Sequence, residues 1–471
     1  MTDVLMALYR HLPPSLRSVG ASLSGYRLHR WRYGPETDRL VERALERDTW
    51  DARQWEVWLG ERLAYVLHRS SQMVPYYRDY WLARRRHGDR SSPDVLQNWP
   101  VLKKEAVREN PRAFVAEDCD VRSMYHLRTS GSTGKPLSLW WSRATVRSWY
   151  ALFEARTRQW YGVSRHDRWA ILGGRLVTPF AQRLPPFWVW NAGLRQLYMS
   201  SYHLAPDNVC AYLQAMRAYG VSYMLGYPSS MYALAQVVLE RHLEVPPLRV
   251  AVSNAEPFYD HQRKAVAEAF RCPVRDTYGM AEIACAAGEC ASGTMHLWPE
   301  VGLLEVLRDD SDLPLPPTQV GRLICTGLLN ADMPLIRYEV GDRGAAGPQR
   351  TACTCGRTLP AMYEVEGRLG DTVLTQDGRR VSRLTLAFQG DLPIREAQVI
   401  QDKLGCIRVR LVPAPGYTKK HETIIAQRLR ERLGDMDIRL EPVEQIPRSA
   451  NGKFRAVVSH LGSSPARAPE P

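Results

Sequence analysis

The sequence predicts an α/β protein with a large N-terminal domain and a small, mobile α+β C-terminal domain. Three observations lead to this expectation. The chain has 471 residues, more than the ~250–300 residues at which one hydrophobic core usually stops growing. Short apolar runs alternate with stretches of helical spacing, which is typical of buried mixed or parallel sheets. After residue 368 a second, shorter alternation of strand-like and helical segments begins.

The N-terminal and central segments support this class in chain order. From Thr37 to about Arg86, charged and apolar residues mix at helical spacing and predict one or two long amphipathic helices. Further on, the runs RWAILGG, VSYMLGYP, LRVAVSNAE and CPVRDTYG each end at a Gly, Pro or Asn turn, with helical stretches between them. In such folds ligands bind beyond the carboxyl ends of the strands. We therefore expect functional residues directly after these runs.

The last third of the chain predicts a β-rich section and then a separate domain. The stretch GRLICTGLLNADMPLIRYEVGDRG has the Gly and Pro turns of a small barrel or meander. Strand-like IRVRLVP and helical HETIIAQRLRERLG follow. We expect a large domain with a helical N-terminal extension at 1–368, a small lid domain at 369–460 and a disordered tail at 461–471.

Composition limits the classes of function. With 45% hydrophobic and 24% charged residues the chain is typical of a folded globular protein. The net charge of +13 is spread along the chain and carried mostly by arginine. A nucleic-acid or acidic-lipid partner is one interpretation, and a solvated arginine-rich surface is the interpretation we favour, because no run of like charges concentrates the excess. We expect no nucleic-acid partner.

Targeting signals are not evident in the sequence. Pro13 and Pro14 interrupt the first segment, so we expect no signal peptide, and the sequence contains no run of about 18 apolar residues that would predict a transmembrane segment. Nine cysteines in a chain of this length favour a reducing compartment, and a cytoplasmic location is expected. The N-terminus is interpreted as a helix packed on the main body, with peripheral membrane contact as the alternative.

The most informative stretch is TSGSTGKP at Thr129–Pro136, between the strand-like segments MYHLR and LSLWW. Its small residues let the backbone approach a polyphosphate, and Lys135 adds positive charge. It is not a Walker A sequence, because two residues instead of four separate the glycines and Pro136 follows the lysine. A flexible Ser/Gly hairpin is the alternative interpretation.

Four further motifs follow in order: DTYGMAE at 276–282, RYEVGD at 337–342, GR at 367–368 and IPRSANGK at 446–453. Together with TSGSTGKP, in this order and spacing, they resemble the adenylate-forming superfamily of acyl-CoA synthetases, peptide synthetase adenylation domains and luciferases. Lys135 before Pro136, NAEP at 254–257 and the segment CTCGRT narrow the resemblance to the phenylacetate-CoA ligase-like branch, including homologues found with capsular polysaccharide genes. The similarity runs from about Trp99 to Arg455.

The resemblance implies an ATP-dependent ligase that activates a carboxylic acid as an acyl adenylate and releases pyrophosphate. Transfer of the acyl group to CoA, or to another thiol, amine or hydroxyl acceptor, would follow. The implied cofactors are ATP, Mg²⁺ and CoA. The oligomeric state is left undecided, with a homodimer as one alternative. Alternatives are an adenylyltransferase that leaves AMP on its product, of the deazaflavin-adenylylating type, and, from another class, a zinc-containing nucleic-acid-binding protein. The aromatic-rich segment PFAQRLPPFWVWNAGLRQLYMSSYH does not identify the acid.

The resemblance also implies roles for individual residues. Glu282 would coordinate Mg²⁺, a hard cation that prefers carboxylate and phosphate oxygens. Asp342 would accept hydrogen bonds from the ribose hydroxyls. Arg368 would lie at the interdomain hinge near the nucleotide. The β- and γ-phosphates would be held by Ser130, Gly131, Ser132, Thr133, Gly134 and Lys135, of which Thr133 and Lys135 are also catalytic candidates. The adenine site would be lined by Glu256, Asp276, Tyr278 and Gly279.

Lys453, close to the C-terminus, would reach the α-phosphate and the carboxylate only when the small domain closes. Positive charge there would offset the charge that develops during the transfer. Without the surrounding motif, the alternative interpretation of Lys453 is an ordinary surface lysine. The segment GRLGD departs from the family pattern at Gly370, where the family usually has Asp or Lys. Glycine allows hinge motion, but the departure leaves the second half-reaction open.

Cys290, His296, Cys353 and Cys355 form a candidate metal site. The spacing C-x5-H followed by C-x-C supplies four ligands, enough for a closed, structural Zn²⁺ site. Some relatives carry similar residues. The alternative is three free cysteines with an incidental histidine, and Cys285 is a substitute ligand.

Overall fold

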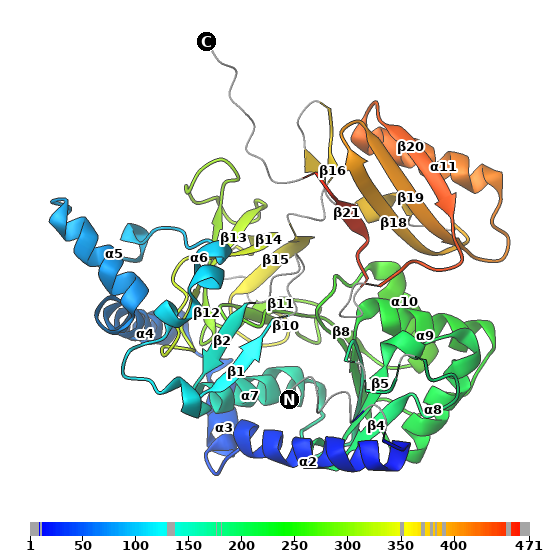
Figure 1. Cartoon of the computed structure of the whole chain (residues 1–471), viewed down its shortest axis with the longest axis horizontal. Coiled ribbons are helices and arrows are strands. Elements are labelled where there is room, and N and C mark those ends of the chain that lie inside the picture. The colour runs from blue at the N-terminus through cyan, green and yellow to red at the C-terminus, as the bar shows by residue number, and fades with distance from the viewer. Residues whose placement is uncertain are drawn as a thin grey trace. The chain divides into compact units, whose positions relative to one another are not determined.

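The computed structural model describes residues 9, 12–129, 137–175, 177–179, 181–348, 353–368, 373–376, 380–381, 384–388, 392–448 and 454–461. The chain divides into two compact units, residues 1–365 and 366–471 (Figure 1). Both units combine sheets with helices, so the predicted α/β class is confirmed. No helix in the described part of the chain has the length and apolar character needed to cross a bilayer.

In the part of the chain that the structure describes, the first unit starts with the long helices α2 (Pro14–Arg32), α3 (Thr37–Arg47), α4 (Ala52–Met73) and α5 (Pro75–Arg86). Residues 37–86 therefore form three helices, and the expectation of one or two was wrong. An Asp51–Gln54 capping box begins α4, and Pro75 begins α5, because a proline without an N–H is best placed in a first helical turn. Helix α2 packs on the main body through α7 (Arg143–Thr157) and β4 (Trp188–Asn191), as in the favoured interpretation of the N-terminus.

A six-stranded sheet forms one layer of this unit, in the order β4-β5-β3-β6-β7-β8. All its pairs are parallel except β4 with β5. Apolar side chains of α8, α9 and α10 pack on one face, and Phe153 of α7 packs on the other. The bounds are β3 Trp169–Gly173, β4 Trp188–Asn191, β5 Gln196–Ser200, β6 Tyr223–Gly226, β7 Ala251–Ser253, β8 Val274–Arg275, α8 Val209–Ala218, α9 Pro228–Glu240 and α10 Asp260–Phe270. This is the sheet that the apolar runs predicted.

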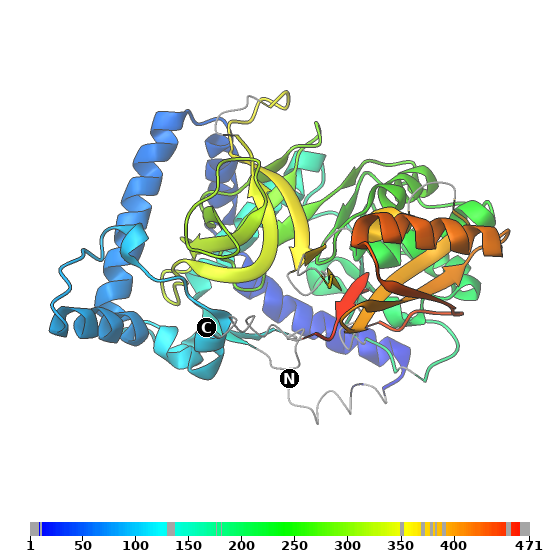
Figure 2. The same ribbon diagram turned by 90° about the horizontal axis from the view of Figure 1, so that it is seen from above.

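A seven-stranded sheet follows, in the order β12-β13-β14-β15-β11-β10-β9. Its bounds are β9 Thr277–Gly279, β10 Ala286–Glu289, β11 Met295–Leu297, β12 Gly302–Leu307, β13 Gly321–Gly327, β14 Tyr338–Ala346 and β15 Ala361–Arg368. One residue, Asp276, separates β8 of the parallel sheet from β9. Figure 2 shows that β14 and β15 are strongly curved.

Two shorter elements lie near these sheets. Strands β1 (Tyr125–Arg128) and β2 (Ser138–Trp141) pair as an antiparallel hairpin, which agrees with the two strand-like segments expected around the glycine-rich stretch. Helix α6 (Lys104–Glu109) begins two residues after Leu102, which forms a parallel bridge with Tyr338 of β14.

Among its described residues, the second unit has a four-stranded sheet in the order β20-β19-β18-β21, a two-stranded sheet of β16 and β17, and the helix α11. The bounds are β16 Val373–Leu374, β17 Arg380–Val381, β18 Ile394–Lys403, β19 Cys406–Pro413, α11 Lys419–Leu433, β20 Asp437–Pro442 and β21 Val457–Ser459. Ile425 and Leu429 of α11 are fully buried against Val399 and Val409 of the sheet.

Candidate functional site

Asp276 lies where the parallel sheet passes into the curved sheet. Its carboxylate accepts hydrogen bonds from the Ser253 hydroxyl, at the end of β7, and from the Thr277 N–H at 2.8 Å. Its own N–H donates to Glu289 Oε2 at 2.7 Å. Burial raises the pKa of Asp276 to about 6, against the opposing effects of the Ser253 hydrogen bond and Arg263. Asp276 is therefore a carboxyl group whose charge is sensitive to pH below neutrality.

Glu289 was missed by the sequence analysis. Nη1 of Arg263 lies 3.0 and 2.8 Å from its two carboxylate oxygens, so a charged pair holds the backbone of Asp276. The available signal was a carboxylate at the end of the apolar run ACAAGE, because an acidic residue in a buried strand needs a partner.

Tyr278 and Asp342 are brought together from distant strands. The Tyr278 hydroxyl donates to Asp342 Oδ2 at 2.9 Å, although β10, β11 and β15 lie between β9 and β14 in the sheet order. Four strand spacings in a flat sheet would separate the two strands by about 19 Å, so the sheet must curl to make this contact. Burial and the Asp342 carboxylate raise the pKa of Tyr278, which keeps the phenol neutral.

Glu282 lies next to β14, the strand that carries Asp342. Its Oε1 accepts hydrogen bonds from Lys104 Nζ at 2.8 Å and from the Tyr338 hydroxyl at 3.0 Å. Glu282 is only 8% exposed and Tyr338 is fully buried. Burial and the Glu282 carboxylate raise the pKa of Tyr338. Lys104 and Tyr338 were not among the residues expected from the sequence.

Glu256 lies beyond the carboxyl end of β7, as expected. Its Oε2 accepts a hydrogen bond from the Ser229 N–H at 3.1 Å, in the first turn of α9. Ala255, beside it, has a φ of 65°, a left-handed conformation that costs a non-glycine residue energy and is concentrated at functional loops. Gly279 ends β9 and pairs with Ala286 of β10.

The remaining predicted nucleotide residues are not placed. Arg368 ends β15, and its side chain is outside the description. Lys453 and the stretch Ser130, Gly131, Ser132, Thr133, Gly134 and Lys135 lie outside the described residues, the latter between β1 and β2.

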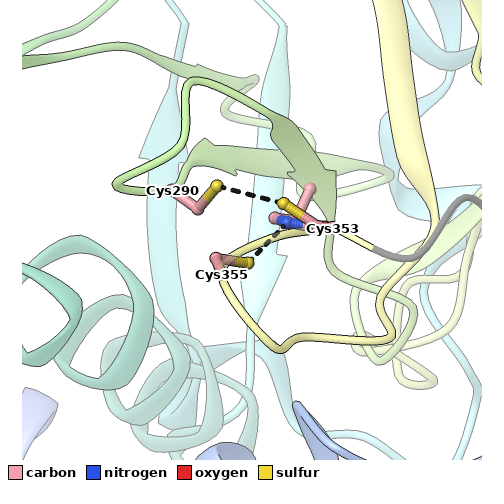
Figure 3. Close-up of side chains that lie close together, drawn as sticks. Cys290, Cys353 and Cys355 are labelled. Carbon is pink, nitrogen blue, oxygen red and sulfur yellow. Dashed lines mark hydrogen bonds between the residues drawn. The ribbon is translucent and has the colours of Figure 1, made fainter.

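The four candidate metal ligands form one cluster, and Figure 3 shows the side chains of Cys290, Cys353 and Cys355 close together. The ligand atoms of Cys290, His296, Cys353 and Cys355 all lie within 4.8 Å of one another. Sγ of Cys290 is 3.7 Å from Sγ of Cys353, and Sγ of Cys355 is 3.3 Å from Nε2 of His296. A tetrahedral zinc with Zn–S bonds of about 2.3 Å needs S···S separations of about 3.8 Å. The donor set and its spacing therefore fit a closed zinc site.

The surroundings of the cluster also fit a metal. Nδ1 of His296 lies 3.1 Å from the Leu359 carbonyl oxygen, which favours a proton on Nδ1 and a free lone pair on Nε2, toward the sulfurs. Cys285 is not in the cluster, and its suggestion as a substitute ligand was wrong. It lies in the core, where its hydrogen bond with Cys325 and burial raise the pKa of Cys325.

A buried ionic network anchors the turn that carries Cys353 and Cys355. The Thr358 N–H donates to the Asp48 carbonyl oxygen at 2.9 Å. The Asp48 carboxylate accepts from Arg156 Nε at 2.8 Å and from Trp160 Nε1 at 2.7 Å. Arg156 is fully buried and also pairs with Glu300 at 2.7 and 3.0 Å. The network joins the α3–α4 connection, α7 and the cysteine turn.

Two family models match the chain. The model for AMP-binding enzymes matches residues 82–331, and the model for the CapK C-terminal domain matches residues 373–460. The protein CapK of Staphylococcus aureus is 23% identical, over 97% of this chain and 100% of that protein. A phenylacetate-coenzyme A ligase of Thermus thermophilus is 28% identical, over 49% of this chain and 58% of that protein.

A solved structure has the same fold. It is a 2-hydroxyisobutyryl-CoA ligase in the postadenylation state, and it superposes with a TM-score of 0.67 at 20% identity, over 88% of this chain and 91% of that one.

Proposed function

The chain belongs to the AMP-binding enzyme family, and on this premise we propose that it joins AMP from ATP to a small carboxylic acid and releases pyrophosphate. It is an enzyme of the AMP-forming ligase class, similar to the phenylacetate-CoA ligases. We propose further that the acyl group then passes to CoA or to another thiol, amine or hydroxyl acceptor.

The observation that carries the proposal is the contact between Tyr278 and Asp342. It supports a nucleoside site, because the Asp342 carboxylate offers acceptor oxygens to ribose hydroxyls and the neutral Tyr278 offers a ring face to adenine. Glu256 and Asp276 lie at the ends of neighbouring strands, where nucleotides bind in such sheets.

The chemistry of the remaining candidates is consistent with adenylation. Glu282 would hold Mg²⁺, which would neutralise charge on the triphosphate. Ser130–Lys135 would bind the β- and γ-phosphates. Lys453 would stabilise the charge that develops as the acid attacks the α-phosphorus.

Pyrophosphate exchange tests this proposal. The full-length protein is incubated with ATP, Mg²⁺ and labelled pyrophosphate, together with aryl, fatty, amino or sugar acids, with and without CoA. We expect exchange that depends on one class of acid, and a fall of roughly 10²-fold in Glu282→Gln. The exposed Glu42→Gln is the matched control and should keep wild-type exchange. Exchange without any added acid, or its absence with every acid, would contradict acyl activation.

Product analysis separates the two enzyme hypotheses. An acyl-transfer enzyme releases free AMP when the acceptor is added, whereas the adenylyltransferase alternative leaves AMP on its final product. Mass spectrometry of the reaction with each acceptor distinguishes these outcomes.

We also propose that the cluster of Cys290, His296, Cys353 and Cys355 holds a structural zinc. Protein purified without chelators is expected to carry one zinc per chain by elemental analysis, and Cys353→Ser should lose it and unfold at a lower temperature. Cys210→Ser is the matched control, because Cys210 is exposed and outside the cluster. Equal zinc content in the two variants would remove the proposal.

A further inference from the structure

Lys104 is held beside the candidate nucleotide site by the backbone. The Leu102 N–H donates to the Arg337 carbonyl oxygen at 2.9 Å, and the Glu339 N–H donates to the Leu102 carbonyl oxygen at 2.9 Å. The segment before Lys104 therefore extends the edge of β14, the strand that also carries Tyr338 and Asp342. Lys104 is the first residue of α6, so its backbone is fixed on both sides.

The side chain of Lys104 pairs with a buried carboxylate. Its Nζ lies 2.8 Å from Glu282 Oε1, and the Glu282 side chain is 6% exposed. A carboxylate at that depth requires a compensating charge. The start of a helix is an unfavourable place for lysines, because it is the positive end of the helix dipole. Lys103 is compensated by Glu339, and Lys104 is compensated by Glu282.

Resting on the proposed function, we propose that Lys104 is a positioning residue that competes with the divalent cation of ATP for the Glu282 carboxylate. Lys104 pairs with Glu282 in the structure, so a divalent cation held by Glu282 would have to break this pair. The ammonium and the metal compete for the same carboxylate, and Mg²⁺ is the stronger partner for an oxygen ligand once phosphate oxygens complete its coordination. Lys104 is thus a positioning residue that keeps Glu282 oriented before ATP arrives.

The competition has a thermodynamic signature. If Mg²⁺ must displace Lys104, part of its binding free energy is spent on breaking the Lys104–Glu282 pair. The gain in ATP affinity caused by Mg²⁺ is then smaller than it would be without the lysine. This gain is a coupling between two ligands and can be measured at equilibrium, without turnover.

Calorimetric titration of ATP tests the proposal. ATP is titrated into the full-length protein in EDTA and in saturating Mg²⁺, with no carboxylic acid present. The dissociation constant in EDTA is divided by the dissociation constant in Mg²⁺, and this ratio is compared between variants. In Lys104→Met the ratio should rise by about fivefold to tenfold, because a charged hydrogen bond no longer opposes the metal. In Lys104→Arg, which keeps a cation, it should stay within about twofold of wild type.

Lys103→Met is the matched control, because Lys103 pairs with Glu339 instead of Glu282. Its ratio should equal that of wild type. An unchanged or lower ratio in Lys104→Met would overturn the inference, whereas wild-type protein that binds no ATP in either condition would overturn the proposed function itself. If Lys104→Met does not fold, Lys104→Gln supplies the same comparison.

Discussion

The Tyr278 hydroxyl links β9 to Asp342, the predicted ribose acceptor on β14. Tyr278→Phe removes it and leaves the ring in place. We expect the KM for ATP to rise by about threefold to tenfold, because Asp342 loses a donor that orients it. Pyrophosphate exchange at varied ATP measures the change. Tyr363→Phe, an exposed tyrosine in β15, should leave the KM unaltered, and an equal rise in both variants would argue against a role for the hydroxyl.

Asp276 gives a pH dependence of stability. Its folded pKa of about 6 exceeds the ordinary value of 3.8, so the folded protein holds this proton more tightly than the unfolded chain. Its contribution is fully present below pH 4 and is lost as the pH rises through 6. Relative to Asp276→Asn, wild type should lose roughly 2–3 kcal/mol of unfolding free energy between pH 4 and pH 7. Chemical denaturation of both proteins across this range measures the difference, and a constant difference would refute the assignment.

Single residues were predictable where a motif follows a strand. Glu256 and Asp276 follow apolar runs and lie just after β7 and β8, whereas Tyr278 lies within β9. Their partners were not predictable in the same way. Lys104 lies 178 residues from Glu282, and only the pair of lysines at a helix start gave a local signal. The contact depends on the pairing of Leu102 with β14, which no nearby residue encodes.

At the scale of elements, the buried ionic network fixes the cysteine turn against α7. Glu300→Gln removes one of two charges that compensate the fully buried Arg156. We expect a loss of about 3–5 kcal/mol of stability, because a buried charge is left without part of its partner. Thermal unfolding monitored by circular dichroism measures it. The exposed Glu42→Gln should unfold at the wild-type temperature, and the same behaviour in Glu300→Gln would show that the pair is dispensable.

Some element boundaries could be read from the sequence and others could not. The Asp51–Gln54 spacing is a capping-box signature, and Pro75 is a helix-start signal, yet the continuous helical pattern across residues 37–86 hid both breaks. The β-rich texture of residues 321–344 was predicted. Its curl was not, because the curl depends on how seven short strands from residues 277–368 pair with one another.

At the scale of the whole molecule, the division into two units leads to a test of whether the C-terminal unit takes part in adenylate formation. The C-terminal unit spans residues 366–471 and includes Lys453. Lys453→Ala is expected to slow adenylate formation by roughly 10²-fold or more while ATP binding persists. Pyrophosphate release and calorimetric ATP binding measure the two effects. Lys420→Ala, an exposed lysine of α11 in the same unit, is the control. Unchanged pyrophosphate release in Lys453→Ala would refute the role.

The passage from β8 to β9 through Asp276 alone has a mechanical consequence. Consecutive Cα atoms are only about 3.8 Å apart, so this joint contains no slack. A displacement of Tyr278 by a bound ligand is transmitted to the end of β8, and through Ser253 to β7. We therefore expect the two sheets to shift together when a ligand binds at Tyr278.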